Sequence, residues 1–168
     1  MIDQSLVLIK PDGVQRGLVG EILSRFEKVG LTIVGMKMFL VTPDFAKKHY
    51  NAHVDKAFYA GLEAMITEGP VIAMVLEGVN AVELVRKMVG GTEPKSAQPG
   101  TIRGDYAHVS YEYADEKGIA IKNLIHASGN LEEAKQEVAL WFTKEELHKY
   151  EPTHEKHTRY VNKNGRKN

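Results

Sequence analysis

The stretch SLVLIKPDG, residues 5–13, predicts a buried strand that leaves into a turn, because a short apolar run stops at a Lys-Pro-Asp-Gly sequence. Apolar segments at residues 31–41 and 70–76 carry the same strand signal. The first is rich in β-branched residues, and the second has a proline at its first position. A last apolar run predicts a fourth strand at residues 122–126. Four short strands of this kind predict a single sheet.

Helical signals lie between and after these strands. Apolar residues spaced four apart predict an amphipathic helix that ends at Gly30. Thr42-Pro43 is typical of a helix start, and Asn80 and Asn130 are expected to cap two later helices, the second with Glu133 three residues on. The resulting order resembles a βαββαβ pattern. It predicts a four-stranded sheet with helices on one face.

The composition limits the classes of function. A length of 168 residues indicates one domain, and 22 basic residues balance 22 acidic ones. This neutrality argues against a partner bound by bulk charge, such as duplex DNA or an anionic membrane. The absence of cysteine excludes disulfides, cysteine-ligated zinc and thiol catalysis. No signal peptide or membrane-spanning apolar run is visible, so we expect a cytoplasmic protein.

Two familiar kinds of site can be tested on the sequence. The segment from Gly90 to Ser96 resembles a phosphate-binding P-loop, but Pro94 stands where the backbone needs glycine, so this interpretation fails. His49 and His53 are four residues apart and could share a helix face as zinc ligands do. No glutamate accompanies them as in a metalloprotease, and we interpret them as ordinary core or surface histidines.

His126 is the strongest chemical candidate. It ends an apolar strand, and the small residues at 127–129 separate it from a helix N-terminus whose amides and dipole suit a phosphate. Glu137 lies on that helix, within reach of an imidazole. Together these residues indicate a site for an anionic substrate. A local anion site could also draw on Lys10, Arg86, Thr92 and Arg103.

Three motifs resemble those of nucleoside diphosphate kinases: IKPDGVQRGL at residues 9–18, PGTIRGDY at 99–106 and NLIHAS at 123–128. The resemblance runs from about residue 4 to residue 150. It implies a ferredoxin-like α/β sandwich with a four-stranded antiparallel sheet. It also implies ping-pong transfer of the γ-phosphate of a nucleoside triphosphate, typically ATP, to a nucleoside diphosphate. The intermediate would be a phosphohistidine on Nδ1 of His126, and the reaction would maintain NTP and dNTP pools.

The resemblance also implies the roles of other residues. Those that would hold the phosphates are Lys10, Arg86, Thr92 and Arg103. Those that would contact the sugar are Lys10 and Asn123, and Phe58 would stack on the base with Leu62 beside it. Those that would orient the histidine are Tyr50, Ser128 and Glu137. Mg²⁺ would arrive on the nucleotide phosphates, and the chain would form a homo-hexamer or homo-tetramer.

The sequence departs from the family pattern at two places. Gly129-Asn130 stands where the family usually has Asp-Ser, so the turn after the histidine loses a carboxylate. A segment is also inserted between Asp105 and Asn123. Its alternating apolar residues predict an extra β-hairpin near residues 107–121, beside the nucleotide entrance or at a subunit contact.

Two other classes of function are weighed against the kinase. The change at Gly129 leaves open a catalytically impaired relative that binds nucleotides or acts as a scaffold. A nucleic-acid-binding module would need a basic and aromatic motif, which is not found. The chain divides into a catalytic domain at residues 1–150 and a polar basic tail at 151–168. Residues 150–168 hold five basic and two acidic side chains, so the remaining body is slightly acidic.

Overall fold

A four-stranded antiparallel sheet forms the centre of the computed structural model, which describes residues 1–158. The strand order is β2-β3-β1-β4, and the predicted sheet is confirmed. The strands are β1 (Ile2–Ile9), β2 (Thr32–Phe39), β3 (Val71–Val79) and β4 (Ile125–Ala127). The central strand β1 pairs with β4 so that Leu8 lies opposite His126. This register brings His126 close to the end of β1, where Lys10 follows.

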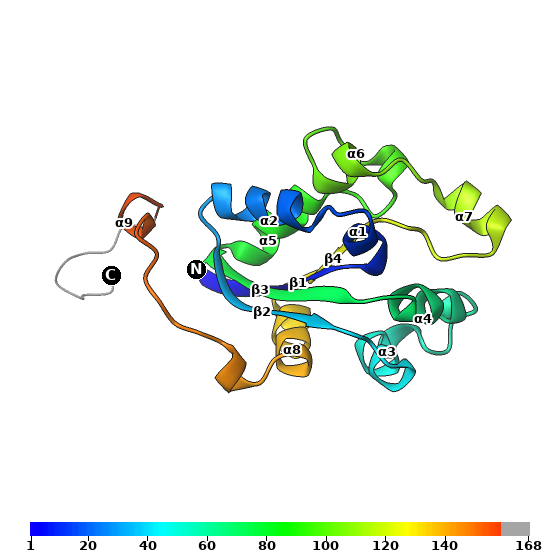
Figure 1. Cartoon of the computed structure of the whole chain (residues 1–168), viewed down its shortest axis with the longest axis horizontal. Coiled ribbons are helices and arrows are strands. Elements are labelled where there is room, and N and C mark those ends of the chain that lie inside the picture. Colours follow the sequence, from blue (N-terminus) through cyan, green and yellow to red (C-terminus); the bar gives the residue numbers. More distant parts are fainter. Residues whose placement is uncertain (159–168) are drawn as a thin grey trace.

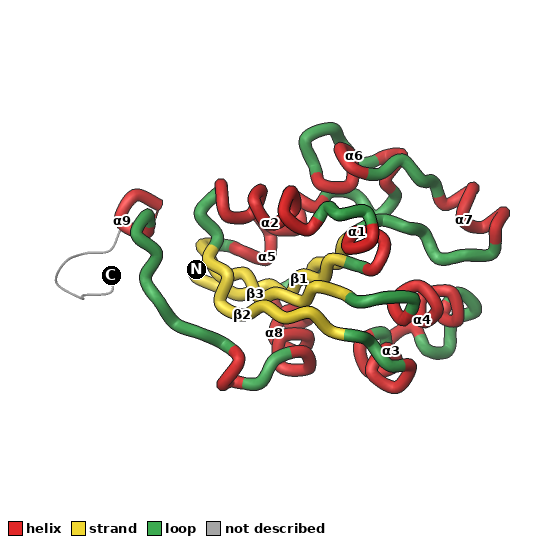
Figure 2. Tube along the Cα trace, in the orientation of Figure 1, coloured by secondary structure: helices red, strands yellow, loops and turns green. Residues whose placement is uncertain are grey.

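Helices cover both faces of the sheet, so the expectation of one covered face is wrong (Figure 1, Figure 2). One face carries α2 (Val19–Lys28) and α5 (Ala81–Val89). The other carries α3 (Pro43–His49), α4 (Tyr59–Thr67) and α8 (Leu131–Trp141). The physical reason lies in β1, where residues 6–9 are all fully buried. Because neighbouring side chains of a strand point to opposite faces, an unbroken buried run requires a cover on each side.

Short helices occupy the connections and the end of the described chain. They are α1 (Pro11–Gln15), η1 (Asn51–His53), η2 (Pro94–Ser96), α6 (Ile102–Tyr106), η3 (Lys144–Glu146) and α9 (Glu155–Thr158). The turn expected after β1 is the first turn of α1, because Pro11 stands at its first helical position. The last strand begins later than expected, at Ile125.

The predicted β-hairpin near residues 107–121 is wrong, because this segment contains a helix, α7 (Tyr111–Lys117). The Ser110 hydroxyl caps it by accepting the Tyr113 N–H at 3.2 Å. The helix ends at Gly118, whose φ of 62° is in the left-handed region. A capping serine and a terminal glycine are helix boundary signals, and they outweigh the alternation of the two tyrosines.

The residues that lead into the tail run beside β2. The His148 N–H donates to the Val34 carbonyl at 2.7 Å, and the Tyr150 hydroxyl donates to the Ile33 carbonyl at 3.0 Å. The remainder of the predicted basic tail, residues 159–168, lies outside the described residues. Among the described helices, none is long and apolar enough to cross a bilayer.

Candidate active site

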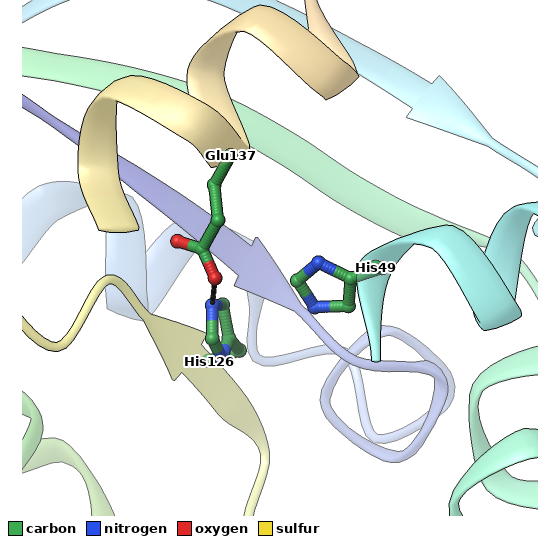
Figure 3. A group of neighbouring side chains, drawn as sticks. All are labelled: His49, His126 and Glu137. Atoms are coloured by element: carbon green, nitrogen blue, oxygen red, sulfur yellow. Dashed lines mark hydrogen bonds and ion pairs between the residues drawn. The ribbon is translucent and has the colours of Figure 1, made fainter. Parts of the chain in front are cut away.

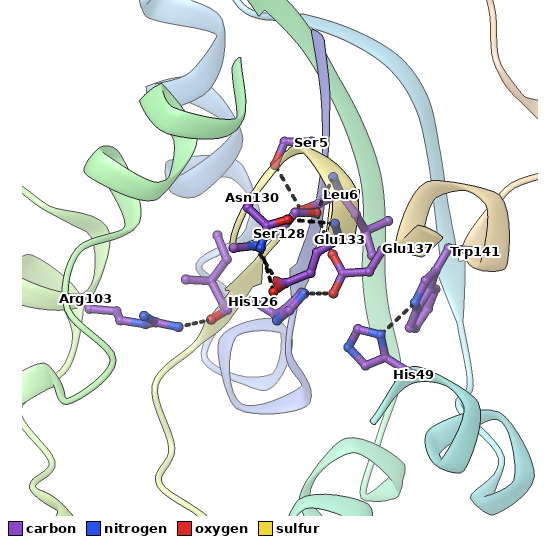
Figure 4. A network of polar contacts seen from close by, with 12 residues as sticks. Ser5, Leu6, His49, Arg103, His126, Ser128, Asn130, Glu133, Glu137 and Trp141 are labelled. Atoms are coloured by element: carbon purple, nitrogen blue, oxygen red, sulfur yellow. Dashed lines mark hydrogen bonds and ion pairs between the residues drawn. The ribbon is translucent and has the colours of Figure 1, made fainter. Parts of the chain in front are cut away.

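His126 is held by a carboxylate on the neighbouring helix. Its Nε2 lies 2.8 Å from Glu137 Oε1, and the Ser128 hydroxyl donates to Glu137 Oε2 at 2.5 Å (Figure 3, Figure 4). The Ser128 oxygen in turn accepts the Leu6 N–H at 3.1 Å. Because the carboxylate accepts, Nε2 carries the proton of the neutral ring, and Nδ1 keeps its lone pair. Within residues 1–158, no hydrogen bond occupies Nδ1.

Glu137 stays anionic in this arrangement. Burial raises its pKa, but the hydrogen bonds from His126 and Ser128 help to outweigh burial and lower the pKa below its ordinary value. An anionic carboxylate is the stronger acceptor for the Nε2–H group. The pair therefore fixes both the tautomer and the direction of the His126 ring.

A second histidine packs beside the first. The His49 ring meets His126 edge to face, with centroids 4.8 Å apart, and its Nδ1 accepts the indole N–H of Trp141 at 3.2 Å (Figure 4). Burial lowers the pKa of His49 to about 3, so the ring is neutral. Its protonated Nε2 is buried without a hydrogen-bond partner. The other candidate of the zinc pair, His53, is exposed.

His49, His126 and Glu137 are the group in residues 1–158 whose ligand atoms lie close enough for a metal ion, within 4.8 Å of one another. Two of the three side chains, His49 and Glu137, already accept hydrogen bonds. Trp141 occupies Nδ1 of His49, and His126 and Ser128 occupy the carboxylate. A metal ion would have to displace these bonds. The cluster therefore fits a packed support for His126 better than a metal centre.

Lys10 lies buried at the end of β1, with 7 % of its surface exposed. Its ammonium donates to Asn123 Oδ1 at 2.7 Å, and the Asn123 amide donates to the Thr92 carbonyl at 2.8 Å. Burial, together with the charge of Arg103, lowers the pKa of Lys10 to about 8. No carboxylate forms an ion pair with Lys10 within residues 1–158.

Arg103 is the second buried cation, 4 % exposed. Its guanidinium donates to three backbone carbonyls, those of Gly90, Asn123 and Ile125. Figure 4 shows Arg103 on the side of the strand that carries His126. Burial and the charge of Arg86 lower the pKa of Arg103 to about 10. Within residues 1–158 neither buried cation has an ion-pair partner, an unfavourable arrangement that a bound anion would relieve.

The structure brings most of the predicted site residues together. One hydrogen-bonded group joins His126, Ser128 and Glu137, and a second joins Lys10, Thr92, Arg103 and Asn123. Arg86 lies in the last turn of α5, and Tyr50 packs on His49 with ring centroids 4.6 Å apart. Phe58 and Leu62 lie outside both groups. Phe58 is 56 % exposed directly before α4, and Leu62 is partly buried within that helix.

Two residues of the site were missed by sequence reasoning. His49 was set aside as ordinary, although its place at the end of a capped helix is visible in the sequence. The sequence indicates only a turn at Asp12, yet its carboxylate is buried and its charge acts on the two buried cations. An acidic residue inside an otherwise apolar and basic motif was the signal that could have identified it.

Three amides at the expected phosphate site, the N-terminus of α8, are not available to a phosphate because each already donates a hydrogen bond. Asn130 Oδ1 accepts the N–H groups of Glu132 and Glu133, and Glu133 Oε2 accepts the Gly129 N–H at 3.0 Å. The helix thus caps itself. The Glu133 carboxylate also stiffens the turn at Gly129, where the family pattern would have an aspartate.

A Gly129→Asp substitution is therefore expected to destabilise this chain, although it restores the family pattern. A Cβ at position 129 would lie 2.5 Å from Glu133 Oε2, so the flexible Glu133 side chain would move away and lose its bond to the Gly129 N–H, and the new carboxylate would repel it. We expect a loss of about 1–2 kcal/mol in the free energy of unfolding, measured by urea denaturation. The double variant Gly129→Asp with Glu133→Ser should recover most of it. A single variant as stable as the wild type would contradict this account of the turn.

Comparison with known proteins agrees with the motifs. Residues 3–147 match the family model of nucleoside diphosphate kinase. The nucleoside diphosphate kinase of Pyrococcus horikoshii is 54% identical over 148 residues, which cover 88% of this chain and 90% of that protein. A transition-state mimic of the Borrelia burgdorferi enzyme with bound vanadate and ADP has a TM-score of 0.92 at 44% identity, covering 95% of this chain and 98% of that chain.

A second solved structure is that of the nucleoside diphosphate kinase from Halobacterium salinarum in complex with CDP. It has a TM-score of 0.83 at 40% identity and covers 94% of this chain and 99% of that chain. The match therefore extends over nearly the whole of both proteins, in sequence and in fold. This chain belongs to the nucleoside diphosphate kinase family, and it transfers a phosphoryl group from a nucleoside triphosphate to a nucleoside diphosphate.

Proposed function

We propose that the transfer proceeds through a phosphohistidine on His126, in two half-reactions at one site. The Nδ1 lone pair attacks the γ-phosphorus and forms an N–P bond, while the bond from that phosphorus to the β,γ-bridging oxygen breaks and releases the diphosphate. A second diphosphate then takes the phosphoryl group from Nδ1 by the reverse step. The observation that carries this proposal is the Glu137 contact, which fixes Nε2 and leaves Nδ1 unbonded.

Buried positive charge supports the same proposal on the substrate side. Phosphoryl transfer asks mainly for positioning and for neutralisation of charge on the phosphates. Lys10 and Arg103 supply two cations, and each keeps N–H groups beyond those used in the bonds described above. We assign the same phosphate-binding role to Arg86 and Thr92, and sugar contacts to Asn123 and Lys10.

The nucleoside end of the site would be formed by α4 and the residue before it. Phe58 presents an exposed ring on which a base can stack, with Leu62 beside it. Stacking on a ring reads no hydrogen-bonding edge, so it accepts any base. At the other end Tyr50, Ser128 and Glu137 would orient His126. For Tyr50 the support is its packing on His49.

The residues present do not fit a protein-bound magnesium ion. Among the described residues, the group with metal-ligand spacing is His49, His126 and Glu137, whose side chains already take part in hydrogen bonds. The buried charges around Lys10 are mainly positive. We therefore propose that Mg²⁺ arrives on the phosphates of the nucleotide and there neutralises part of their charge. The compartment we propose is the cytoplasm, which supplies nucleoside di- and triphosphates.

We also propose that the chain forms a homo-hexamer or homo-tetramer. The edge strand β2 and the residues after it expose Met36, Met38 and Leu40, each by more than half. An exposed apolar edge strand favours pairing with another chain. In a homo-oligomer, the chain that pairs with this edge would be a second copy of the same chain.

Steady-state kinetics test the two-step proposal. ATP and GDP are varied against each other, and the double-reciprocal plots are expected to be parallel lines, because the first product leaves before the second substrate binds. Intersecting lines would mean that both nucleotides are bound during transfer. That result would overturn the phosphohistidine route while leaving the overall activity intact.

Nucleotide binding is expected to weaken as the pH rises through about 8. Because burial lowers the pKa of Lys10 to about 8, the residue loses its positive charge in this range, and a polyanion binds the charged form better. The ADP dissociation constant, measured by calorimetry, should rise by up to about tenfold per pH unit above that value. Lys10→Gln should bind ADP more weakly at pH 7 but without this pH dependence. The same dependence in Lys10→Gln would contradict the assignment.

The α7 segment is expected to affect nucleotide binding. The Tyr111 N–H donates to Glu93 Oε1 at 2.9 Å, and beyond α7 a Cβ on Gly61 would lie 3.2 Å from the Ala120 nitrogen. The segment thus bridges the loop of Thr92 and helix α4. Replacing residues 111–119 by an equally long Gly-Ser linker should raise the KM for nucleotides about fivefold, equivalent to about 1 kcal/mol. The oligomer mass, measured by light scattering, should not change. An unchanged KM with an altered mass would place α7 at a subunit contact instead.

A further inference from the structure

We propose that Asp12 is a positioning residue for His126, because its carboxylate holds the strained turn from which β4 begins. Asp12 does not touch the histidine. Asp12 acts on the backbone of Leu124, two residues before His126, and on the two buried cations of the phosphate site. The inference rests on the proposed role of His126, and it assigns this carboxylate of α1 to the reaction.

The strain lies at Leu124. Its φ is 70°, which side-chain-bearing residues rarely adopt, and the Ile125 N–H donates to the Asn123 carbonyl at 2.8 Å. A hydrogen bond between residues two apart around a positive φ is a γ-turn, a rare and strained conformation. Leu124 is fully buried, so its backbone groups need partners inside the protein. Any relaxation of this turn would move the start of β4 and with it His126.

Helix α1 and the residue before it supply those partners. Asp12 Oδ2 accepts the Leu124 N–H at 2.9 Å, and the Lys10 N–H donates to the Leu124 carbonyl at 2.8 Å. Gly13 permits the approach, since a Cβ there would lie 3.0 Å from the Leu124 carbonyl oxygen. Without the Asp12 side chain the Leu124 N–H would be buried and unpaired, and the turn would lose the contact that opposes its strain.

The charge of Asp12 serves the phosphate site as well. Among residues 1–158, Asp12 is the acidic residue that is buried, and its Oδ1 has no hydrogen-bond partner. No ion pair joins it to Lys10 or Arg103 in that range, yet its negative charge partly opposes the lowering of both pKa values by burial and so favours the charged forms. In return the two cations stabilise a carboxylate oxygen that would otherwise be unfavourable in the interior. The same side chain thus supports the nucleophile through a hydrogen bond and the cations through charge.

Two substitutions separate the hydrogen bond from the charge. Asp12→Asn keeps an oxygen that can accept the Leu124 N–H, whereas Asp12→Ala removes both bond and charge. The matched control is Asp3→Ala at the far end of β1, because Asp3 Oδ1 also accepts a backbone N–H, that of Val82 at 2.9 Å. The full-length chain is used for all variants. Thermal unfolding of each variant shows whether it is folded.

The first readout requires no activity. Hydrogen exchange of the Leu124 and Ile125 amides should be about tenfold faster in Asp12→Ala and unchanged in Asp12→Asn and Asp3→Ala. The second readout is phosphorylation of His126 by phosphoramidate, a donor without a nucleotide. Its rate should fall about 100-fold in Asp12→Ala, because the ring is misplaced, and should stay within about threefold of the wild type in the other two variants.

The third readout is the pH dependence of ADP binding, which a merely structural role would not move. In Asp12→Asn the alkaline loss of affinity should shift to lower pH, because Lys10 has lost a negative charge that raises its pKa. An Asp12→Ala protein that reacts with phosphoramidate at the wild-type rate would overturn the inference. So would an Asp12→Asn protein that loses as much reactivity as Asp12→Ala while its Leu124 amide stays protected.

If Asp12→Ala does not fold, Asp12→Asn decides alone. Retained amide protection and reactivity together with the shift of ADP binding to lower pH support the inference, whereas an unshifted pH profile, or lost reactivity with the Leu124 amide still protected, overturns it. Failure of the proposed function would look different. A wild-type protein that takes the phosphoryl group from phosphoramidate but not from ATP would refute the kinase mechanism while the effect of Asp12 on His126 could still be measured.

Discussion

Replacing His126 with alanine is expected to reduce phosphoryl transfer by about 10⁴-fold or more, because the nucleophile that accepts the γ-phosphate is lost. The fold should survive. The His126 side chain is 24% exposed and lies at the rim of the core, so its removal leaves the sheet intact. The measurement is kcat for the ATP and GDP pair, with thermal unfolding as the check of folding. His154→Ala, which changes an exposed histidine of the tail, is the matched control and should keep full activity.

Residual activity in this variant would be informative. If the His126→Ala protein retained a turnover within about tenfold of the wild type, the phosphoryl group would have to pass directly between two bound nucleotides. The buried cations would then still explain phosphate binding, but the hydrogen bond between Glu137 and Nε2 would play no part in catalysis.

Replacing Glu137 with alanine has the second-largest expected effect, a loss of about 10²-fold in kcat with KM changed by less than about threefold. The carboxylate holds the ring rather than the nucleotide, so its loss misplaces the nucleophile and leaves substrate binding nearly intact. Glu137→Gln should lose only about tenfold, because an amide oxygen can still accept the Nε2–H group. Stopped-flow measurement of the first half-reaction separates this effect from product release.

Stability gives an independent check on Glu137. Its removal leaves the Ser128 hydroxyl without its acceptor, so the free energy of unfolding should fall by about 1–3 kcal/mol. Because the pKa of Glu137 is lowered in the folded protein, its contribution is present at neutral pH and is lost as the pH falls through that lowered value. A variant with unchanged kcat but a raised KM would show that Glu137 contacts the nucleotide instead of orienting His126.

The sheet could be predicted because its signals are local. The apolar runs at residues 5–9 and 70–76 identify buried strands, and Thr42 and Asn130 make the expected capping bonds. The expected cap at Asn80 is wrong, because its side chain makes no capping bond and Asp3 Oδ1 accepts the Val82 N–H instead. The same runs also held the information that both faces are covered, since an unbroken buried strand has no solvent side. The βαββαβ order of the elements by itself suggested that helices cover only one face of the sheet.

The inserted segment shows where local patterns mislead. Tyr111 and Tyr113 alternate as strand residues do, but about half the surface of each is exposed, so neither is buried against a sheet. The boundary residues Ser110 and Gly118 decided the structure in favour of a helix. In so short a segment, a cap at each end is a stronger signal than two matching side chains.

The finer geometry of the site could not be predicted from residue spacing. The contact of His49 with His126 joins residues 77 positions apart, and that of Asp12 with Leu124 joins residues 112 apart. The positive φ at Leu124 is held by tertiary contacts such as the one with Asp12. Because the residue is not a glycine, the sequence gives no sign of this conformation. Charge arithmetic likewise showed a neutral chain, while the fold concentrates Lys10 and Arg103 in one buried place.

The most direct test of the mechanism is to trap the intermediate. The full chain is incubated with γ-labelled ATP and separated from free nucleotide, and the bound label is examined for stability in acid and in base. We predict about one label per chain, labile in acid and stable in base, absent from His126→Ala and discharged as GTP when GDP is added. An active wild-type protein that holds no label, or a label that remains on His126→Ala, would contradict a phosphohistidine at His126.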